Sequence, residues 1–350
     1  MTCDASARED SRYVTGVRQL RRDNVVPEGG NGERRQAHNG MKAILHRRTL
    51  HNDTRSFSRR GLLLAGASAF AALAADGSSR ISVEGYIFNQ YAERQKKPLG
   101  EIVPEALAMA RNAGFWNIEL NTTFFAPETR ATTLQGIRSN RLSMPSVYVG
   151  GAMHEQSLAA KTIESALQTG AVCAPSGCKA IVNNPDPKPS GAEKSDDELR
   201  VQAQMLNRAG RTLSAHGFQL RVHHHTPQLV NNAREWRHIL RNTDPEYVTL
   251  CMDLDWVHQA DLDPLTLLKE GGRRVTEIHV RNSKDKLWLE AVEDGDIDYR
   301  AIAKYLREQN NKPLVVVELA YRPNTVITHS LAQDLTSSRI YTERIFGIKA

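Results

Sequence analysis

The chain has 350 residues, of which 40% are hydrophobic and 25% are charged, a composition typical of a globular protein with a large core. The formal net charge is +6 and the pI is near 9.1, but residues 1–75 hold 13 of the 46 Lys and Arg residues and only 7 of the 40 Asp and Glu residues. The rest is formally neutral. Because nucleic-acid binding normally requires a basic face, we expect no nucleic-acid partner.

The N-terminal region carries a targeting pattern. Arg59 and Arg60 precede an uncharged, Ala-rich run from Gly61 to Ala75, and the Ala-Leu-Ala at 72–74 has the small-x-small form of a cleavage site. The pattern resembles a twin-arginine export signal. The run is shorter than the ~20 residues needed to span a bilayer. We therefore expect export to the periplasm and no stable membrane anchor.

From residue 81 onward, short β-rich runs alternate with helical segments eight times. The predicted strands are Ile81 to Phe88, Trp116 to Leu120, Pro145 to Val149, Cys178 to Val182, Gln219 to His223, Val248 to Asp253, Val275 to Val280 and Leu314 to Leu319. The predicted helices include Glu101 to Asn112, Leu158 to Gln168, Asp196 to Ala215, Ala233 to Arg241 and Tyr299 to Gln309. Eight such units predict an α/β fold, a parallel (β/α)8 TIM barrel. An open doubly wound sheet is the rival, but no Gly-x-Gly-x-x-Gly turn follows the first strand.

These patterns divide the chain into four regions. We predict a disordered polar extension at residues 1–57, an export signal at 58–75, a single barrel domain at 80–325 and a C-terminal helical segment at 326–350. Met41 is a second candidate start. No CxxC pair occurs, and whether Cys173 and Cys178 pair is left open.

Ionisable side chains stand at the predicted C-terminal ends of four consecutive strands. In the run "QLRVHHHTPQL" the apolar residues occupy the helix-facing side, which places His223 and His225 on the inner side. The same alternation places Asp253, His279 and Glu318 inward on the sixth, seventh and eighth strands. Because the βα loops of a TIM barrel gather at this end, functional residues are expected there.

Four of these side chains form a predicted metal site: His223, Asp253, His279 and Glu318. Two carboxylates facing two imidazoles around a divalent ion balance its charge. A single interior histidine is more often a hydrogen-bonded polar group. Four such residues in register favour one divalent metal ion.

From about residue 80 to 325 the chain resembles the sugar phosphate isomerase/epimerase family, the xylose isomerase-like TIM barrels. The pieces that carry the resemblance are "MPSVYVGGAMHE", "KSDDELRVQAQMLNRAGRTLSAHGFQLRVHHH", "CMDLDWVHQA", "IHVRNSKDKLWLEAVEDGDIDY" and "LVVVELAYRP". It implies that Asp253, His279 and Glu318 match three of the four ligands of one divalent cation, often manganese, cobalt or zinc. Where many members have a glutamate on the fifth strand, this chain has His223. Since a metal-bound histidine is a poor general base, the glutamate pair of the family's epimerases is incomplete here.

The resemblance implies a metal-dependent isomerase or epimerase that acts on a sugar, keto sugar or polyol by proton transfer next to a carbonyl. Glu318 is the predicted catalytic base, and His225, Asp255 and His258 are further candidates. A keto-sugar dehydratase or keto-glycoside lyase would use the same site, and a non-catalytic sugar-binding barrel stays open. The neutral barrel and the lack of further obvious ligands disfavour an apurinic-type DNA endonuclease.

Substrate contacts are predicted at Arg281, Trp256, His154 and Asn183. A salt bridge is the ordinary alternative for Arg281, and core packing is the ordinary alternative for Trp256. We expect a small carbohydrate as the partner, while homo-oligomer formation is left open. The sequence shows no Gly-rich phosphate loop, so a phosphorylated substrate is not implied.

Overall fold

A computed structural model describes residues 79–323 and 325–350. The predicted extension at 1–57 and the predicted export signal at 58–75 lie outside the described residues. Within the described ranges, every helix is too short or too polar to cross a membrane.

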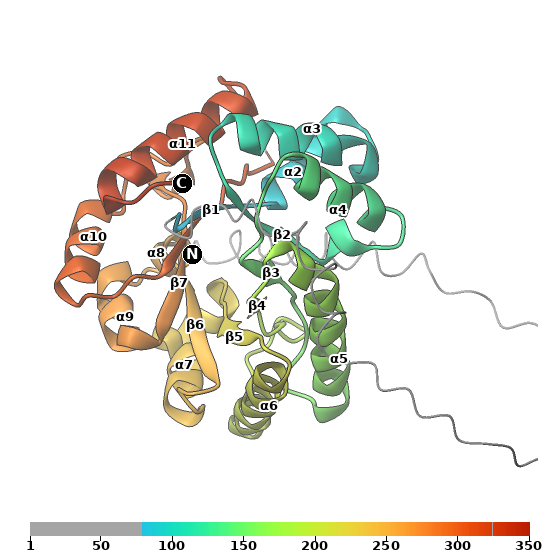
Figure 1. The fold of residues 1–350 in the computed structure, drawn as a ribbon. Coiled ribbons are helices and arrows are strands. Elements are labelled where there is room, and N and C mark those ends of the chain that lie inside the picture. Colours follow the sequence, from blue (N-terminus) through green and yellow to red (C-terminus); the bar gives the residue numbers. More distant parts are fainter. Residues whose placement is uncertain (1–78, 324) are drawn as a thin grey trace, which may run out of the picture. The chain divides into compact units, whose positions relative to one another are not determined.

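Eight parallel strands close into a barrel in the order β1-β10-β7-β6-β5-β4-β3-β2, with helices around it (Figure 1). This confirms the (β/α)8 prediction. The barrel strands are β1 (Ile81–Glu84), β2 (Asn117–Asn121), β3 (Ser146–Tyr148), β4 (Ala180–Asn183), β5 (Gln219–Val222), β6 (Val248–Asp253), β7 (Val275–Val280) and β10 (Leu314–Val317). A short antiparallel hairpin, β8 (Ser283–Lys284) and β9 (Leu287–Trp288), follows β7 and was not predicted.

The helices lie outside the barrel. They are α2 (Tyr86–Gln95), α3 (Leu99–Asn112), α4 (Arg130–Ser139), α5 (Gln156–Cys173), α6 (Asp196–Ala215), α7 (Thr226–Asn242), α8 (Leu254–Gln259), α9 (Pro264–Gly271), α10 (Tyr299–Glu308) and α11 (Leu331–Phe346). Short 3-10 helices cover Thr122–Phe125, Ala174–Ser176 and Gly272–Arg274.

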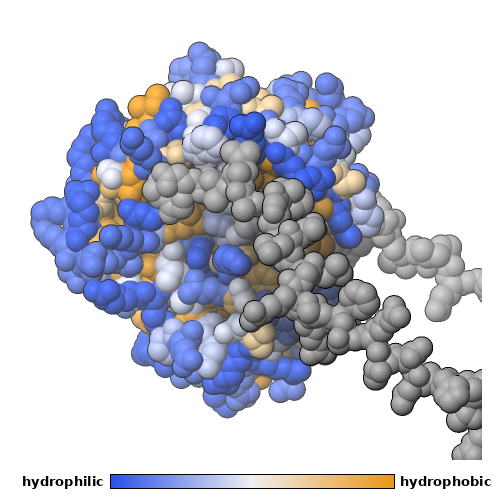
Figure 2. Space-filling view, viewed as in Figure 1, coloured by the Kyte–Doolittle hydropathy of each residue, from blue (hydrophilic) through white to orange (hydrophobic). Residues whose placement is uncertain are grey.

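Helix α6 shows how the sequence forms these outer elements. Ser195 Oγ accepts from the Glu198 N–H at 3.2 Å and the Glu198 carboxylate accepts from the Ser195 N–H at 2.6 Å, a capping box that starts the helix. Leu199, Leu206 and Leu213 recur every seven residues and are buried. On the face shown in Figure 2, hydrophilic side chains predominate along the outer edge formed by the helices.

The predicted first strand, Ile81 to Phe88, is wrong in its second half. Strand β1 ends at Glu84, and α2 begins at Tyr86. A Cβ on the intervening Gly85 would lie 2.6 Å from Leu120 Cδ2, so glycine lets the chain turn close against β2. The residues after it have high β propensity, but packing of the following segment as a helix against α3 overrides that preference.

The cysteines of the described part are free thiols. Cys173, Cys178 and Cys251 are all buried. Burial raises the pKa of Cys178 to about 12, so its thiol stays protonated near neutral pH.

Strand register brings the C-terminal ends of β5, β6, β7 and β10 to one level. Asp253 is the register partner of His279 across β6 and β7, and Val316 is the partner of His279 across β10 and β7. Beyond the strand ends, the His223 N–H donates to Asn183 O at 2.9 Å and the Glu318 N–H donates to Val280 O at 3.1 Å. The backbone thus holds the four predicted ligands side by side.

Candidate active site

The structure brings the four predicted metal ligands together at the C-terminal end of the barrel. We call His223, Asp253, His279 and Glu318 the ligand cluster; one ligand atom from each lies within 4.8 Å of the others. Nδ1 of His279 is 2.6 Å from Glu318 Oε2, and Nε2 of His223 is 4.0 Å from Asp253 Oδ2. All four side chains are buried.

Several lone pairs of the ligand cluster have no partner. Neither ring nitrogen of His223 has a hydrogen-bond partner among the described residues, and the same holds for Asp253 Oδ2. Asp253 Oδ1, in contrast, accepts from the Trp256 N–H at 2.9 Å. A buried polar atom without a partner is costly. The donor set therefore fits a divalent ion, which would occupy these lone pairs.

Metal and protons compete for the ligand cluster. Burial alone would lower the pKa of His279, but Cys251 and Glu119 raise it well above its usual value, so a metal ion would have to displace a proton from this ring. Burial and the neighbouring imidazoles of His279 and His225 lower the pKa of His223 well below its usual value, which leaves the ring neutral. Burial and the charge of Glu318 raise the pKa of Asp253. Burial alone would also raise the pKa of Glu318, but the hydrogen bond from His279 and the charge of Arg281 lower it well below its usual value. Glu318 is therefore ionised.

Arg281 lies among carboxylates rather than in an open pocket. Its Nη1 is 3.3 Å from Glu318 Oε1, its Nε is 3.3 Å from Asp255 Oδ2, and its Nη2 is 3.6 Å from Asp253 Oδ2. The guanidinium stacks between Trp256 and Trp288, whose ring centroids are 5.1 and 4.1 Å away. Arg281 thus positions two members of the ligand cluster; a contact with substrate stays a prediction.

Carboxylates outnumber arginines at this level. Asp253, Asp255 and Glu318 face one guanidinium, that of Arg281, and Glu318 also contacts Nδ1 of His279. Burial and the charge of Glu318 raise the pKa of Glu84 at the end of β1, as they do that of Asp253. A divalent cation at this level would replace the protons that these raised pKa values favour.

A second polar set lies one step deeper in the barrel. We call Glu119, Arg221 and Glu277 the inner layer. Arg221 Nη1 pairs with Glu277 Oε2, while His279 Nε2 lies 3.2 Å from Glu119 Oε1 and 3.3 Å from Glu277 Oε1. Burial and the charge of Glu277 raise the pKa of Glu119 to about 7. Burial alone would raise the pKa of Glu277, but Arg221 and the hydrogen bond from His279 lower it to about 2.

The inner layer also has metal-ligand geometry together with His279. Glu277 is already paired with the Arg221 cation, and Glu119 can hold a proton that it shares with Glu277. The ligand cluster is therefore the better metal site. The inner layer holds Nε2 of His279 and so directs Nδ1 toward Glu318.

The predicted proton-transfer candidates fall in two places. His225 is buried, and its ring lies 5.0 Å from that of His223 and 5.1 Å from that of Trp256. Burial lowers its pKa to about 4, so its ring is neutral. His258 lies on α8, where Nε2 contacts Asp296 Oδ2 at 3.2 Å. No contact of His258 with the ligand cluster occurs in the described part of the chain.

The remaining predicted pocket residues are buried on the β3 and β4 sides. Asn183 Nδ2 donates to Val149 O at 2.7 Å, which fixes the ends of β3 and β4 together. His154 Nε2 lies 3.7 Å from Glu155 Oε1, and burial and the charge of Lys194 lower its pKa. Their roles toward a substrate stay predictions.

Sequence reasoning missed several neighbours of the ligand cluster. Trp288 comes from the unpredicted hairpin β8–β9 and covers Arg281. Tyr148 at the end of β3 packs edge-on against His223, with ring centroids 5.3 Å apart. Glu84 and Glu119 are register partners on β1 and β2. A period-2 reading of these two strands, with β1 ended before Gly85, would have placed both glutamates inward.

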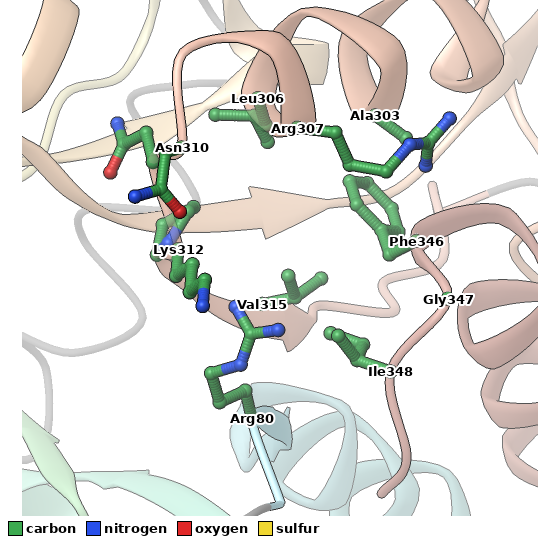
Figure 3. A pocket seen from close by; sticks show the side chains of 12 residues that line it. Arg80, Ala303, Leu306, Arg307, Asn310, Lys312, Val315, Phe346, Gly347 and Ile348 are labelled. Carbon is green, nitrogen blue, oxygen red and sulfur yellow. The ribbon is translucent and has the colours of Figure 1, made fainter.

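A separate cavity lies at the other end of the barrel (Figure 3). It is lined by residues that precede β1 and β10 and by the end of α11, among them Arg80, Lys312 and Phe346. These are the N-terminal ends of the strands. In TIM-barrel enzymes that end contributes to stability rather than to catalysis, so the ligand cluster is the candidate active site.

Comparisons with known proteins identify the family of this barrel. The family model for the xylose isomerase-like TIM barrel matches residues 107–336. An inosose dehydratase of Salmonella agona (strain SL483) is 31% identical over 147 residues, which cover 37% of this chain and 49% of that protein. An inosose dehydratase of Lactiplantibacillus plantarum is 27% identical over 164 residues, which cover 42% of this chain and 54% of that protein. The match thus spans about half the length of these curated relatives.

Solved structures share the fold at low sequence identity. A sugar phosphate isomerase/epimerase from Parabacteroides distasonis superposes with a TM-score of 0.62 at 16% identity and covers 82% of this chain and 98% of its own. An L-ribulose 3-epimerase superposes with a TM-score of 0.61 at 14% identity and covers 76% of this chain and 94% of its own. The family model, which matches most of the barrel, decides the assignment: the chain belongs to the xylose isomerase-like TIM barrel family.

Proposed function

We propose that the chain is a metal-dependent enzyme that moves a proton on the carbon next to a carbonyl group of a sugar, keto sugar or polyol. One observation carries the proposal. The barrel mouth gathers four metal-ligand side chains from four neighbouring strands, with buried lone pairs on His223 and Asp253 that have no hydrogen-bond partner among the described residues. Manganese, cobalt and zinc all accept this set of imidazole and carboxylate ligands.

Glu318 is the group best placed to take the proton. It is ionised, and each of its oxygens has a fixed neighbour, His279 Nδ1 at 2.6 Å and Arg281 Nη1 at 3.3 Å. When bound, a divalent ion would act as a Lewis acid toward the substrate carbonyl and favour loss of the neighbouring proton. His225 and Trp256 form a buried wall beside the cluster, which limits access of water.

Isomerisation or epimerisation is one outcome of this opening step, and dehydration is the second candidate. Epimerisation needs a proton-transfer group on each face of the carbon. His223, which is neutral and replaces a glutamate, is a poor second base. Loss of water requires one base and a route for the leaving hydroxyl. The curated relatives named inosose dehydratase also support this candidate, and a keto-glycoside lyase would begin in the same way.

Deuterium exchange tests the proposal. The purified full chain is loaded with manganese, cobalt or zinc and incubated in deuterated water with a panel of keto sugars and inososes. We expect metal-dependent incorporation of deuterium next to the carbonyl, with a new epimer or loss of water identifying the reaction. Binding without exchange for every compound would instead support a non-catalytic sugar-binding barrel.

We also propose export to the periplasm. The support is the Arg59-Arg60 pair followed by the uncharged run to Ala75. Replacing both arginines with lysine should retain the chain in the cytoplasm, as measured by fractionation. Equal export of the double variant would contradict a twin-arginine route.

A further inference from the structure

Three metal-ligand side chains gather on the loops that follow β7 and β10. We call Glu290, His329 and Asp334 the loop cluster; one ligand atom from each lies within 4.8 Å of the other two. Glu290 follows the hairpin β8–β9, and Asp334 lies in the first turn of α11. Because both loops leave C-terminal strand ends, the loop cluster lies at the same end of the barrel as the ligand cluster.

Asp334 turns one oxygen of its buried side chain toward His329. The side chain is 1% exposed, and its Oδ2 accepts from the Tyr321 hydroxyl at 2.9 Å. Its Oδ1 pairs with His329 Nδ1 at 3.6 Å, and the same nitrogen lies 3.3 Å from the Thr328 hydroxyl. Asp334 and His329 thus present an oxygen and a nitrogen to the same space, at a spacing close to that of two ligands of one ion.

Glu290 fixes the segment that carries the histidine. Its carboxylate accepts from the Thr328 N–H at 2.9 Å, from the Thr328 hydroxyl at 2.7 Å and from the His329 N–H at 3.2 Å. The two loops are thereby held together before any ion binds, which lowers the conformational cost of binding. Coordination by Glu290 would replace one of these hydrogen bonds. The His329 side chain is 61% exposed, so an ion can reach the cluster from solvent.

The surroundings add negative charge and space for water. Glu293 lines the same surface cavity as the loop cluster, and the cavity has a volume of about 650 Å³. Two carboxylate ligands and one imidazole are a typical zinc donor set, with water in the fourth position. Zinc–ligand bonds of about 2.0–2.2 Å place the ligand atoms roughly 3.3–3.6 Å apart. Small side-chain rotations would close the cluster to that spacing.

We propose that the loop cluster is a second divalent-metal site, which binds zinc through Glu290, His329 and Asp334. The imidazole ligand disfavours calcium and magnesium, which prefer all-oxygen sites. Trp288, two residues before Glu290, stacks on Arg281. An ion here would therefore fasten the loop that covers the ligand cluster. The proposal concerns binding alone and does not depend on the proposed reaction.

Zinc counting on the full chain tests this site. Chains are equilibrated with zinc chloride, washed free of loose metal and measured by elemental mass spectrometry. We expect two ions per wild-type chain, one in His329→Ala and one in Asp334→Asn. The control, His216→Ala, removes another exposed histidine and should keep two. Because His329 is exposed, its substitution leaves the core intact.

Asp253→Asn separates the two metal sites. It should lose the ion of the ligand cluster and keep one ion that disappears in Asp253→Asn/His329→Ala. If wild type binds a single ion that His329→Ala loses and Asp253→Asn keeps, the loop cluster stands and the metal part of the proposed function fails. Equal zinc content in wild type and His329→Ala would overturn the loop site, whatever the activity.

Discussion

The inner layer and the ligand cluster are neighbouring polar regions that solve the problem of buried charge in different ways. In the inner layer Arg221 pairs with Glu277, and Glu119 has a pKa raised to about 7, so one shared proton completes the balance. In the ligand cluster and its neighbours, three carboxylates face one arginine, and the ring nitrogens of His223 have no hydrogen-bond partner among described residues. Arg221 and a shared proton can balance the charge of the first region, although both oxygens of Glu119 lack a hydrogen-bond partner among the described residues; in the second region carboxylates outnumber arginines, as expected for a cation site.

The largest effect is expected at Glu318, the ionised carboxylate of the ligand cluster and the proposed base. Glu318→Gln keeps the side-chain shape but removes the base, so deuterium exchange should fall by about 10²–10⁴-fold. Glu308→Gln, which changes an exposed glutamate of α10, is the matched control and should be unaffected. Normal exchange by Glu318→Gln would remove Glu318 from the mechanism.

Removing a ligand should weaken metal binding at the ligand cluster more than removing a supporting residue of the inner layer. We expect His223→Ala to weaken the affinity by more than about 100-fold, and Glu277→Gln by about 10–100-fold, because Glu277 acts through His279. Metal titration against a chelator measures both. Equal effects of the two substitutions would erase the distinction between the regions.

Arg281→Met tests the charge imbalance. It leaves three buried carboxylates without their cation, so the metal-free protein should lose about 3–5 kcal/mol of unfolding free energy. Added metal should restore much of that loss. Urea unfolding with a chelator and with metal compares the two states, and Arg138→Met on the exposed side of α4 is the control. A loss that metal does not reduce would show that the arginine serves packing alone.

The inner layer should make the unfolding free energy depend on pH. The folded pKa of Glu119 is about 7, above its unfolded value near 4.5, so the folded state holds its proton more tightly. The stabilisation is complete below about pH 4.5 and is lost as the pH rises through 7, on the order of 3 kcal/mol. Unfolding free energies of the metal-free chain at pH 5 and pH 8 should differ accordingly, and Glu119→Gln should flatten the dependence. If the unfolding free energy of Glu119→Gln depends on pH as that of the wild type does, a group other than Glu119 causes the dependence.

The smallest effect is expected at His258, which contacts Asp296. Asp296 also accepts from the backbone N–H groups of Asp285 and Lys286, so the loop keeps two other bonds when the imidazole is removed. His258→Ala should cost about 1 kcal/mol or less, about fivefold or less in kcat/KM. A loss of kcat/KM comparable to that of Glu318→Gln would show that His258 takes part in catalysis.

The alternation of strands and helices was sufficient to predict the fold, because eight buried parallel strands leave a repeated apolar signal. The same period placed His223, Asp253, His279 and Glu318 inward at the strand ends, and the structure brings them together. Strand boundaries were less predictable. Residues 86–88 have β propensity, yet the close contact of Gly85 with Leu120 ends β1 early and a helix follows.

Long-range partners could not be predicted from local patterns. Arg281 was expected near substrate, but its three carboxylate contacts depend on where β6, β10 and their loops end. Trp288 lies on a two-stranded hairpin too short to give a periodic signal. The loop cluster joins Glu290 and His329, which lie in loops about 40 positions apart, with Asp334 in the first turn of α11, and loops carry no periodicity that would place them in space.

Metal content at the ligand cluster tests the central claim most directly. Full-length His329→Ala, in which the loop site is disabled, is loaded in turn with manganese, cobalt and zinc, and the bound metal is measured by elemental mass spectrometry. We expect about one ion per chain, lost when Asp253→Asn is added, together with metal-dependent deuterium exchange. No bound ion under any loading condition would mean that the ligand cluster is a polar network of the barrel, and it would contradict a metal-dependent enzyme.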